Sequence, residues 1–201
     1  MAGLAHAQVA DLENPGSVSA IQERPFRMVH ELDLSFGVLP ADAFYVGLFG
    51  QVGYTAHFSD TIAWQIGRAG YNYAARTGLR KDLETKFGVL PTTSEEVQYF
   101  LGSDLIWTPL HMKFAVLNRL VLHGEAFLIV GATVFKFTNT FRPAVNLGIG
   151  ARVVLTQNVS IRLDVTDNVV IPVGGGATAV LNVVATTLSL AINFGAPAQQ
   201  P

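Results

Sequence analysis

The strongest constraint on the fold is a two-residue alternation of apolar and polar side chains. The clearest segment, residues 160–166, reads Ser-Ile-Arg-Leu-Asp-Val-Thr. Successive side chains of a β-strand point to opposite faces, so this pattern predicts a strand with one apolar face. The same alternation is found in residues 26–36, 43–58, 61–73, 97–108, 145–153 and 184–194, while residues 122–137 form one further candidate strand that is apolar on both faces. We therefore expect eight strands.

Few segments of the chain have the sequence pattern of a helix. Residues 114–137 are apolar but interrupted by charges, and residues 169–194 are broken by Pro172 and the run Gly174-Gly175-Gly176. No stretch of about 18 residues therefore reads as a membrane-spanning helix. One short helix is predicted from Thr77 to Phe87, within a long charged loop, with Thr77 as its cap and Gly88 after its end.

Eight antiparallel strands can close into a barrel without free edges, either in water or in a membrane. The composition is unusual for a soluble protein, because 50% of the residues are hydrophobic and 14% are charged, against about 25% charged in soluble domains. The formal net charge of −2 leaves no basic excess for nucleic-acid binding. The lack of cysteine excludes disulfides, thiolate zinc sites and cysteine nucleophiles.

The minority face of the strands distinguishes the two environments. It combines glycines (53, 67, 102, 148 and 150) with a few charged residues in mid-strand. A narrow barrel interior needs small residues beside a few long charged ones, whereas glycine weakens a strand that faces water. We therefore predict an all-β, eight-stranded antiparallel up-and-down transmembrane β-barrel. Its plugged lumen would hold a polar network of Arg27, Glu31, Asp33, Asp104, Glu125, Arg152, Arg162 and Asp164.

Aromatic residues often lie near the strand ends on the apolar face. Aromatic girdles at both interfaces are typical of outer-membrane barrels. The predicted interface aromatics are Phe26, Phe36, Phe44, Phe58, Tyr99, Trp107 and Phe194. The expected location is the bacterial outer membrane, with membrane lipid as the surrounding partner.

Both ends of the chain fit export. Ala5-His6-Ala7 has the form of a signal-peptide cleavage site, so residues 1–7 are interpreted as a signal-peptide remnant. Residues 8–24 form a polar lead-in, residues 25–195 the barrel domain and residues 196–201 a tail. The apolar series Leu188, Leu190, Ile192 and Phe194 resembles the C-terminal insertion signal of bacterial outer-membrane barrels, although Gly195 to Pro201 follow it.

The run from Pro25 to Gly195 resembles a family of eight-stranded outer-membrane β-barrel domains abundant in myxobacteria. Some members are associated with adventurous gliding motility. The resemblance is carried, in order, by Arg24-Pro25-Phe26-Arg27, Val52-Gly53-Tyr54-Thr55-Ala56-His57-Phe58, Gly102-Ser103-Asp104-Leu105-Ile106-Trp107-Thr108-Pro109, Phe141-Arg142-Pro143-Ala144-Val145, Arg162-Leu163-Asp164-Val165-Thr166-Asp167-Asn168 and the strand from Leu188 to Phe194. It implies an architecture and a location, but no catalytic activity.

Candidate catalytic or metal-binding groups are weak. His123 and Glu125 share a strand face but lack a third ligand. His57 with Asp60 is interpreted as turn and interface chemistry. Asp164 and Asp167 lie on opposite faces of a regular strand, and calcium would need more oxygen ligands. We therefore predict no catalytic residue, cofactor or metal site.

The leading hypothesis is a non-enzymatic structural or interaction barrel in a cell-envelope assembly, which the family resemblance extends to gliding motility. Its candidate surfaces are the 75–96 insertion and the link at residues 109–121, which would face the periplasm and dock a periplasmic partner. Part of that link could instead extend the flanking strands. The alternative function is a ligand-binding or transport barrel, and an enzyme ranks third.

Overall fold

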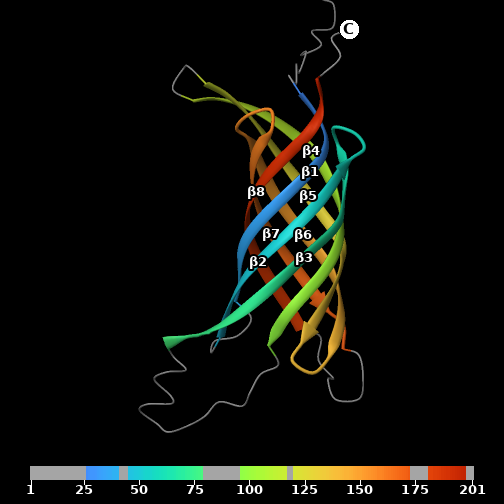
Figure 1. Cartoon of the computed structure of the whole chain (residues 1–201), viewed down its shortest axis with the longest axis vertical. Helices are drawn as coiled ribbons and strands as arrows, with labels where there is room; N and C mark the ends of the chain where they lie inside the picture. The colour runs from blue at the N-terminus through green and yellow to red at the C-terminus, as the bar shows by residue number, and fades with distance from the viewer. Residues whose placement is uncertain (1–25, 41–44, 79–95, 117–119, 173–180, 198–201) are drawn as a thin grey trace, which may run out of the picture.

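The computed structural model describes residues 26–40, 45–78, 96–116, 120–172 and 181–197. Eight antiparallel strands form a closed barrel in chain order, and β1 pairs with β8 to complete it (Figure 1). This confirms the predicted eight-stranded up-and-down barrel. The strands are β1 Phe26–Leu39, β2 Tyr45–His57, β3 Ile62–Arg76, β4 Val97–Val116, β5 Leu120–Phe137, β6 Phe141–Val154, β7 Val159–Val170 and β8 Leu181–Pro197.

The buried polar side chains point into the barrel, and most large aliphatic side chains point out. On β7, Ser160, Arg162 and Asp164 are buried, while Ile161 and Leu163 between them are exposed. Large aliphatic side chains cover the exterior of the other strands in the same way, as at Leu105, 52% exposed. A barrel in water would have the opposite arrangement, so this surface is built to face lipid.

The pairing register shifts at several points, and two of these β-bulges change which face Met28 and Arg68 occupy. The register of β1 against β8 changes between Met28 and His30, so Met28 is buried, although the sequence pattern places it on the same face as the exposed Leu32. The register of β3 against β4 changes between Gln65 and Arg68, and Arg68 is turned inward. A bulge inserts one residue and reverses which face the following side chains occupy. The alternation of residues 26–36 predicts Met28 on the exterior face, and this prediction was therefore wrong.

Short turns join β2 to β3 and β6 to β7. The β2–β3 turn is held by Phe58 N donating to Ile62 O, and the β6–β7 turn by Leu155 N donating to Val159 O. The predicted helix at 77–87 lies outside the described residues from residue 79 onward, as do the proposed signal remnant, the polar lead-in and most of the tail. Among the described residues, no helix is long and apolar enough to cross a membrane.

The barrel interior has two different halves. At the end opposite the C-terminal end of β8, an apolar cluster contains Leu39, Phe49, Phe100, Phe135 and Phe137. Charged side chains occupy the interior closer to the other end. The predicted polar lumen is therefore only part of the interior, because aromatic rings fill the remainder.

Candidate functional site: a charged network in the lumen

Glu31 on β1 is the centre of the charged network. It is fully buried, and its carboxylate accepts from Arg152 Nη2 at 2.6 Å and from Arg162 Nη1 at 3.0 Å. His57 Nε2, at the end of β2, lies 2.9 Å from Glu31 Oε2. Side chains from β2, which is next to β1, and from the adjacent strands β6 and β7 therefore meet at one side chain of β1.

Each arginine of this network contacts a second carboxylate. Arg152 Nη1 donates to Glu125 at 3.1 Å, and Arg162 Nη2 donates to Asp164 at 3.0 Å. Both guanidinium groups also lie over the Phe127 ring, at 5.6 and 5.0 Å from its centroid. Buried charges are stable only when they are paired and hydrogen-bonded, and each of these guanidinium groups meets both conditions.

A second polar group lies between this network and the apolar cluster. Arg68 Nε lies 2.6 Å from Asp104 Oδ2, and Arg68 Nη2 donates to Thr133 Oγ1 at 2.6 Å. Asn146 donates to Asp104 Oδ1 at 2.6 Å and to Thr133 at 2.7 Å. This group connects β3, β4, β5 and β6 across the lumen.

Asp33 differs from the other lumen carboxylates, because its hydrogen-bond donors are neutral. Ser35 Oγ donates to it at 2.8 Å and Gln65 Nε2 at 3.2 Å. The same face of β1 therefore presents two buried acids, Glu31 and Asp33, in different environments.

The structure brings together most residues of the predicted lumen network. Glu31, Glu125, Arg152, Arg162 and Asp164 form one connected group, while Asp104 and Asp33 belong to the layer beside it. Arg27 pairs with Ala196 in the β1–β8 ladder, and its side chain lies outside the described part of the structure.

Sequence reasoning missed two members of these networks. His57 was interpreted as turn chemistry with Asp60, but its ring points to Glu31. Its position two residues after Thr55, on the predicted lumen face, could have indicated this. Arg68 was missed because the bulge reverses the face of β3 after Gln65.

The charged side chains of the lumen networks form ion pairs with one another, as Glu31 does with Arg152 and Arg162. In the parts of the chain that the structure describes, no group of three or more His, Asp or Glu side chains is arranged to hold a metal ion. Glu125, a member of the candidate His123–Glu125 pair, forms an ion pair with Arg152 in the lumen. Asp164 points inward and Asp167 outward, as predicted from the alternation.

The predicted interface aromatics lie on the exterior wherever their side chains are described. Phe36, Phe58, Tyr99, Trp107 and Phe194 are all exposed. The side chain of Phe26 and the whole of Phe44 lie outside the described residues.

The link at residues 109–121 is largely strand rather than loop. β4 and β5 pair from Leu110–Ala126 to Val116–Leu120, forming a hairpin that projects beyond the barrel at the end where β8 finishes (Figure 1). β3 pairs with β4 as far as Trp107, and Thr108 N then donates to Thr61 O. Among the described residues, no strand pairs with this edge of β4 from Pro109 onward, so that part is a free edge. Leu110, Met112 and Phe114 are exposed on this hairpin, and Phe114 covers Gly124 on the facing strand.

Comparison with known proteins supplies structural neighbours but no relatives. No protein-family model matches the sequence, and no curated protein matches it. Among solved structures, the chain is similar to the N-terminal β-barrel domain of Pseudomonas aeruginosa OprF, with 11% identity over 82% of this chain and 96% of that chain and a TM-score of 0.43.

Two further structures have comparable similarity. Neisserial surface protein A has 14% identity over 83% of this chain and 96% of that chain, with a TM-score of 0.44. A major outer membrane protein from Thermus thermophilus has 15% identity over 82% of this chain and 99% of that chain, with a TM-score of 0.40.

The membrane assignment rests on the barrel itself. An even number of antiparallel strands, an apolar exterior and a polar interior are the properties of bacterial outer-membrane barrels. This chain has eight antiparallel strands, an apolar exterior and an interior that is polar and charged over part of its length. The predicted location is therefore supported by the surface of the molecule. The chain is an eight-stranded outer-membrane β-barrel.

Proposed function

We propose that this chain is a non-enzymatic, plugged outer-membrane barrel that acts as a structural or interaction component of the cell envelope. The observation that carries the proposal is the paired network around Glu31, which connects β1 to β6 and β7 across the lumen. An eight-stranded interior is only wide enough for side chains. Ion pairs there join β1 to strands that are not its neighbours in the sheet, and they leave the charges unavailable for solute transport.

Conductance in planar lipid bilayers tests the plugged lumen. We expect the purified full-length barrel to insert without producing large, stable channels. The conductance of the Glu31→Gln variant is measured for comparison, because this substitution removes the carboxylate that Arg152 and Arg162 share. Large, long-lived openings of the wild-type protein would contradict a plugged barrel and favour the transport alternative.

The projecting β4–β5 hairpin is the proposed docking element for a periplasmic protein. A free strand edge presents unpaired N–H and C=O groups that an extended partner segment can pair with. Pro109, at the base of this edge, lacks an N–H and so limits pairing near the membrane. Membership of the motility-associated family stays a prediction.

A shortened hairpin tests this docking. Residues 113–123 can be replaced by Asn-Gly, which joins Met112 to its cross-strand partner Gly124 and retains Glu125. The wild-type and shortened proteins are cross-linked in intact cells. We expect the shortened protein to keep its heat-modifiable gel migration but to lose the cross-linked species that contain a partner protein. A matched variant, Phe114→Thr with full hairpin length, should retain those species if the strand edge is what binds. Unchanged cross-linking by the shortened variant would refute the docking role.

A further inference from the structure

The β4–β5 hairpin has one apolar face and one basic face. Leu110 and Met112 alternate along β4 with His111 and Lys113. His111 lies directly opposite Glu125, which is buried in the lumen, so His111 and Lys113 are on the face that continues the lumen wall. Leu110 and Met112 are on the face that continues the exterior of the barrel.

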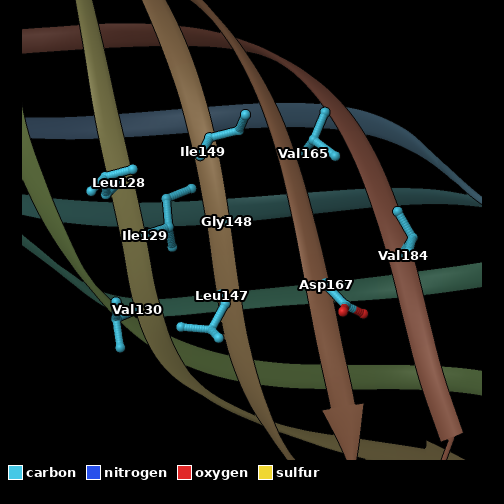
Figure 2. Close-up of a pocket in the computed structure, with 9 residues that line it drawn as sticks. All are labelled: Leu128, Ile129, Val130, Leu147, Gly148, Ile149, Val165, Asp167 and Val184. Atoms are coloured by element: carbon cyan, nitrogen blue, oxygen red, sulfur yellow. The ribbon is translucent and has the colours of Figure 1, made fainter.

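The apolar face of the hairpin extends beyond the part of the barrel that lipid surrounds. Trp107 is exposed on β4 opposite Leu128, and Leu128 belongs to the aliphatic exterior of β5 to β8 (Figure 2). Exposed tryptophans mark the membrane–water interface of barrels. Phe114 lies seven residues beyond Trp107, which is about 23 Å along the strand. Lipid therefore does not cover the outer part of this face.

The backbone of β4 is free on one side of the hairpin. The last bond to β3 runs from Thr108 N to Thr61 O, and beyond that bond no described strand pairs with this edge. His111 Nε2 lies 3.1 Å from the carbonyl oxygen of Asp60, which holds the base of the hairpin against the β2–β3 turn. The free edge beyond this contact covers residues 112–116, about 17 Å of strand.

The backbone, the charge and the apolar face of this edge all fit one kind of occupant. Unpaired N–H and C=O groups along an edge are satisfied by an added strand. Directly opposite residues on two strands favour opposite charges and disfavour like ones, so Lys113 favours an acidic residue in the added strand. The neighbours of that acidic residue then lie beside Met112 and Phe114, where apolar side chains are favoured. A second copy of this edge offers no acidic residue, because residues 110–116 contain none.

We propose that the free edge of β4 binds an extended segment of a partner protein in which acidic and apolar residues alternate. The acidic residues lie opposite Lys113 and on the face of His111, and the apolar residues lie on the face of Met112. This chemistry rests on the docking role proposed for the hairpin and names the sequence pattern that docks there.

Peptide binding by the purified full-length barrel tests this pattern. Fluorescent nine-residue peptides are titrated against the barrel in lipid nanodiscs, and binding is measured by fluorescence anisotropy, with empty nanodiscs as background. One peptide alternates valine and glutamate, and a second alternates valine and lysine. A third has the composition of the first, with its glutamates in a single block. We expect the alternating glutamate peptide to bind roughly tenfold more tightly than either of the others.

Charge reversal on the edge assigns the preference to Lys113. Lys113→Glu should invert it, so that the valine–lysine peptide binds roughly tenfold more tightly than the valine–glutamate peptide. Lys136→Glu is the matched control, because it makes the same change on β5 at the end of the barrel away from the hairpin, and it should leave the preference unchanged. Heat-modifiable migration of each variant verifies that the barrel is folded.

An N-methylated copy of the valine–glutamate peptide tests the backbone pairing. It keeps the side chains but lacks N–H donors, so we expect it to bind at least roughly tenfold more weakly, as the loss of several hydrogen bonds implies.

Three results would overturn the proposal. Equal binding of the alternating and block glutamate peptides would show that no strand is added. Undiminished binding of the N-methylated peptide would show that the backbone does not pair. An unchanged preference in Lys113→Glu would show that this charge does not select the partner. Cross-linking in intact cells is a separate measurement: if the shortened hairpin retains its cross-linked species, the docking role fails even where the peptides bind. Hairpin-dependent cross-linking without any peptide preference would refute the chemistry alone.

Discussion

Glu31→Gln should destabilise the barrel more than any other single carboxylate-to-amide change in the lumen. Glu31 is fully buried and accepts hydrogen bonds from two guanidinium groups, those of Arg152 and Arg162. A hydrogen bond to a charged group contributes about 1.5–3 kcal/mol. Loss of both would thus cost about 3–6 kcal/mol.

Two features reduce that cost. The glutamine retains one oxygen, which can still accept a hydrogen bond. Each arginine also keeps another carboxylate, Glu125 for Arg152 and Asp164 for Arg162. We therefore expect a loss of about 3 kcal/mol in the free energy of unfolding, at the lower end of the cost of breaking a buried ion pair.

The assay is urea unfolding of the refolded barrel in lipid vesicles, followed by heat-modifiable migration and tryptophan fluorescence. Asp33→Asn is the matched control, because it is the same chemical change on the same strand. The donors to Asp33 are the neutral groups of Ser35 and Gln65, so losing the charge also removes a desolvation cost. We expect this control to remain within about 1 kcal/mol of wild type.

The reasoning would be refuted if Glu31→Gln lowered the free energy of unfolding no more than Asp33→Asn does. It would mean that the two arginines obtain little stability from Glu31, and that packing alone holds the lumen together.

Three further expectations concern packing and membrane insertion. Arg68→Met should lower the free energy of unfolding by about 3 kcal/mol because Asp104 loses its buried partner, and adding Asp104→Asn should recover part of this loss in urea titrations. Gly131→Ala should lower the thermal midpoint because a Cβ would overlap Asp104 and the Ser103 backbone, whereas Gly67→Ala should not, because its surroundings are open. Leu163→Arg on the exterior of β7 should cost about 2–4 kcal/mol and reduce the inserted fraction in vesicles.

Each expectation has a contradicting result. Failure of the double variant to recover stability would show that Arg68 acts through something other than Asp104. Equal thermal midpoints for the two glycine variants would contradict the close approach at Gly131. Normal insertion of Leu163→Arg would contradict a lipid-facing β7.

The number and order of the strands could be predicted because alternation is a local property. One apolar face per segment, repeated eight times with turn residues between the segments, is sufficient to predict a barrel. The glycines and the charged residues on the minority face then indicated that this face lines the lumen. Glu31, Arg152 and Arg162 were predicted for the lumen on that basis, and the structure buries all three.

The incorrect predictions of which face a side chain occupies come from irregular backbone. Met28 and Arg68 both lie beside β-bulges, where the pairing register shifts by a residue. A bulge depends on how two strands match across the sheet, so neither strand's own pattern reveals it. The projecting hairpin could not be predicted for a similar reason. The sequence left open whether residues 109–121 are a link or extend the flanking strands, because the point where β3 stops pairing with β4 is a property of the closed barrel.

The sequence by itself determined the eight strands, their facing and the lipid-exposed exterior, because these depend on side-chain periodicity and on residue size. The tertiary structure decided which lumen charges meet, since Glu31 and Arg162 are 131 residues apart in the chain and 3.0 Å apart in space. It also placed the aromatic cluster at one end of the lumen and left Asp167 Oδ1 without a donor among the described residues. Those properties arise only when the first and last strands pair and the walls of the barrel face one another.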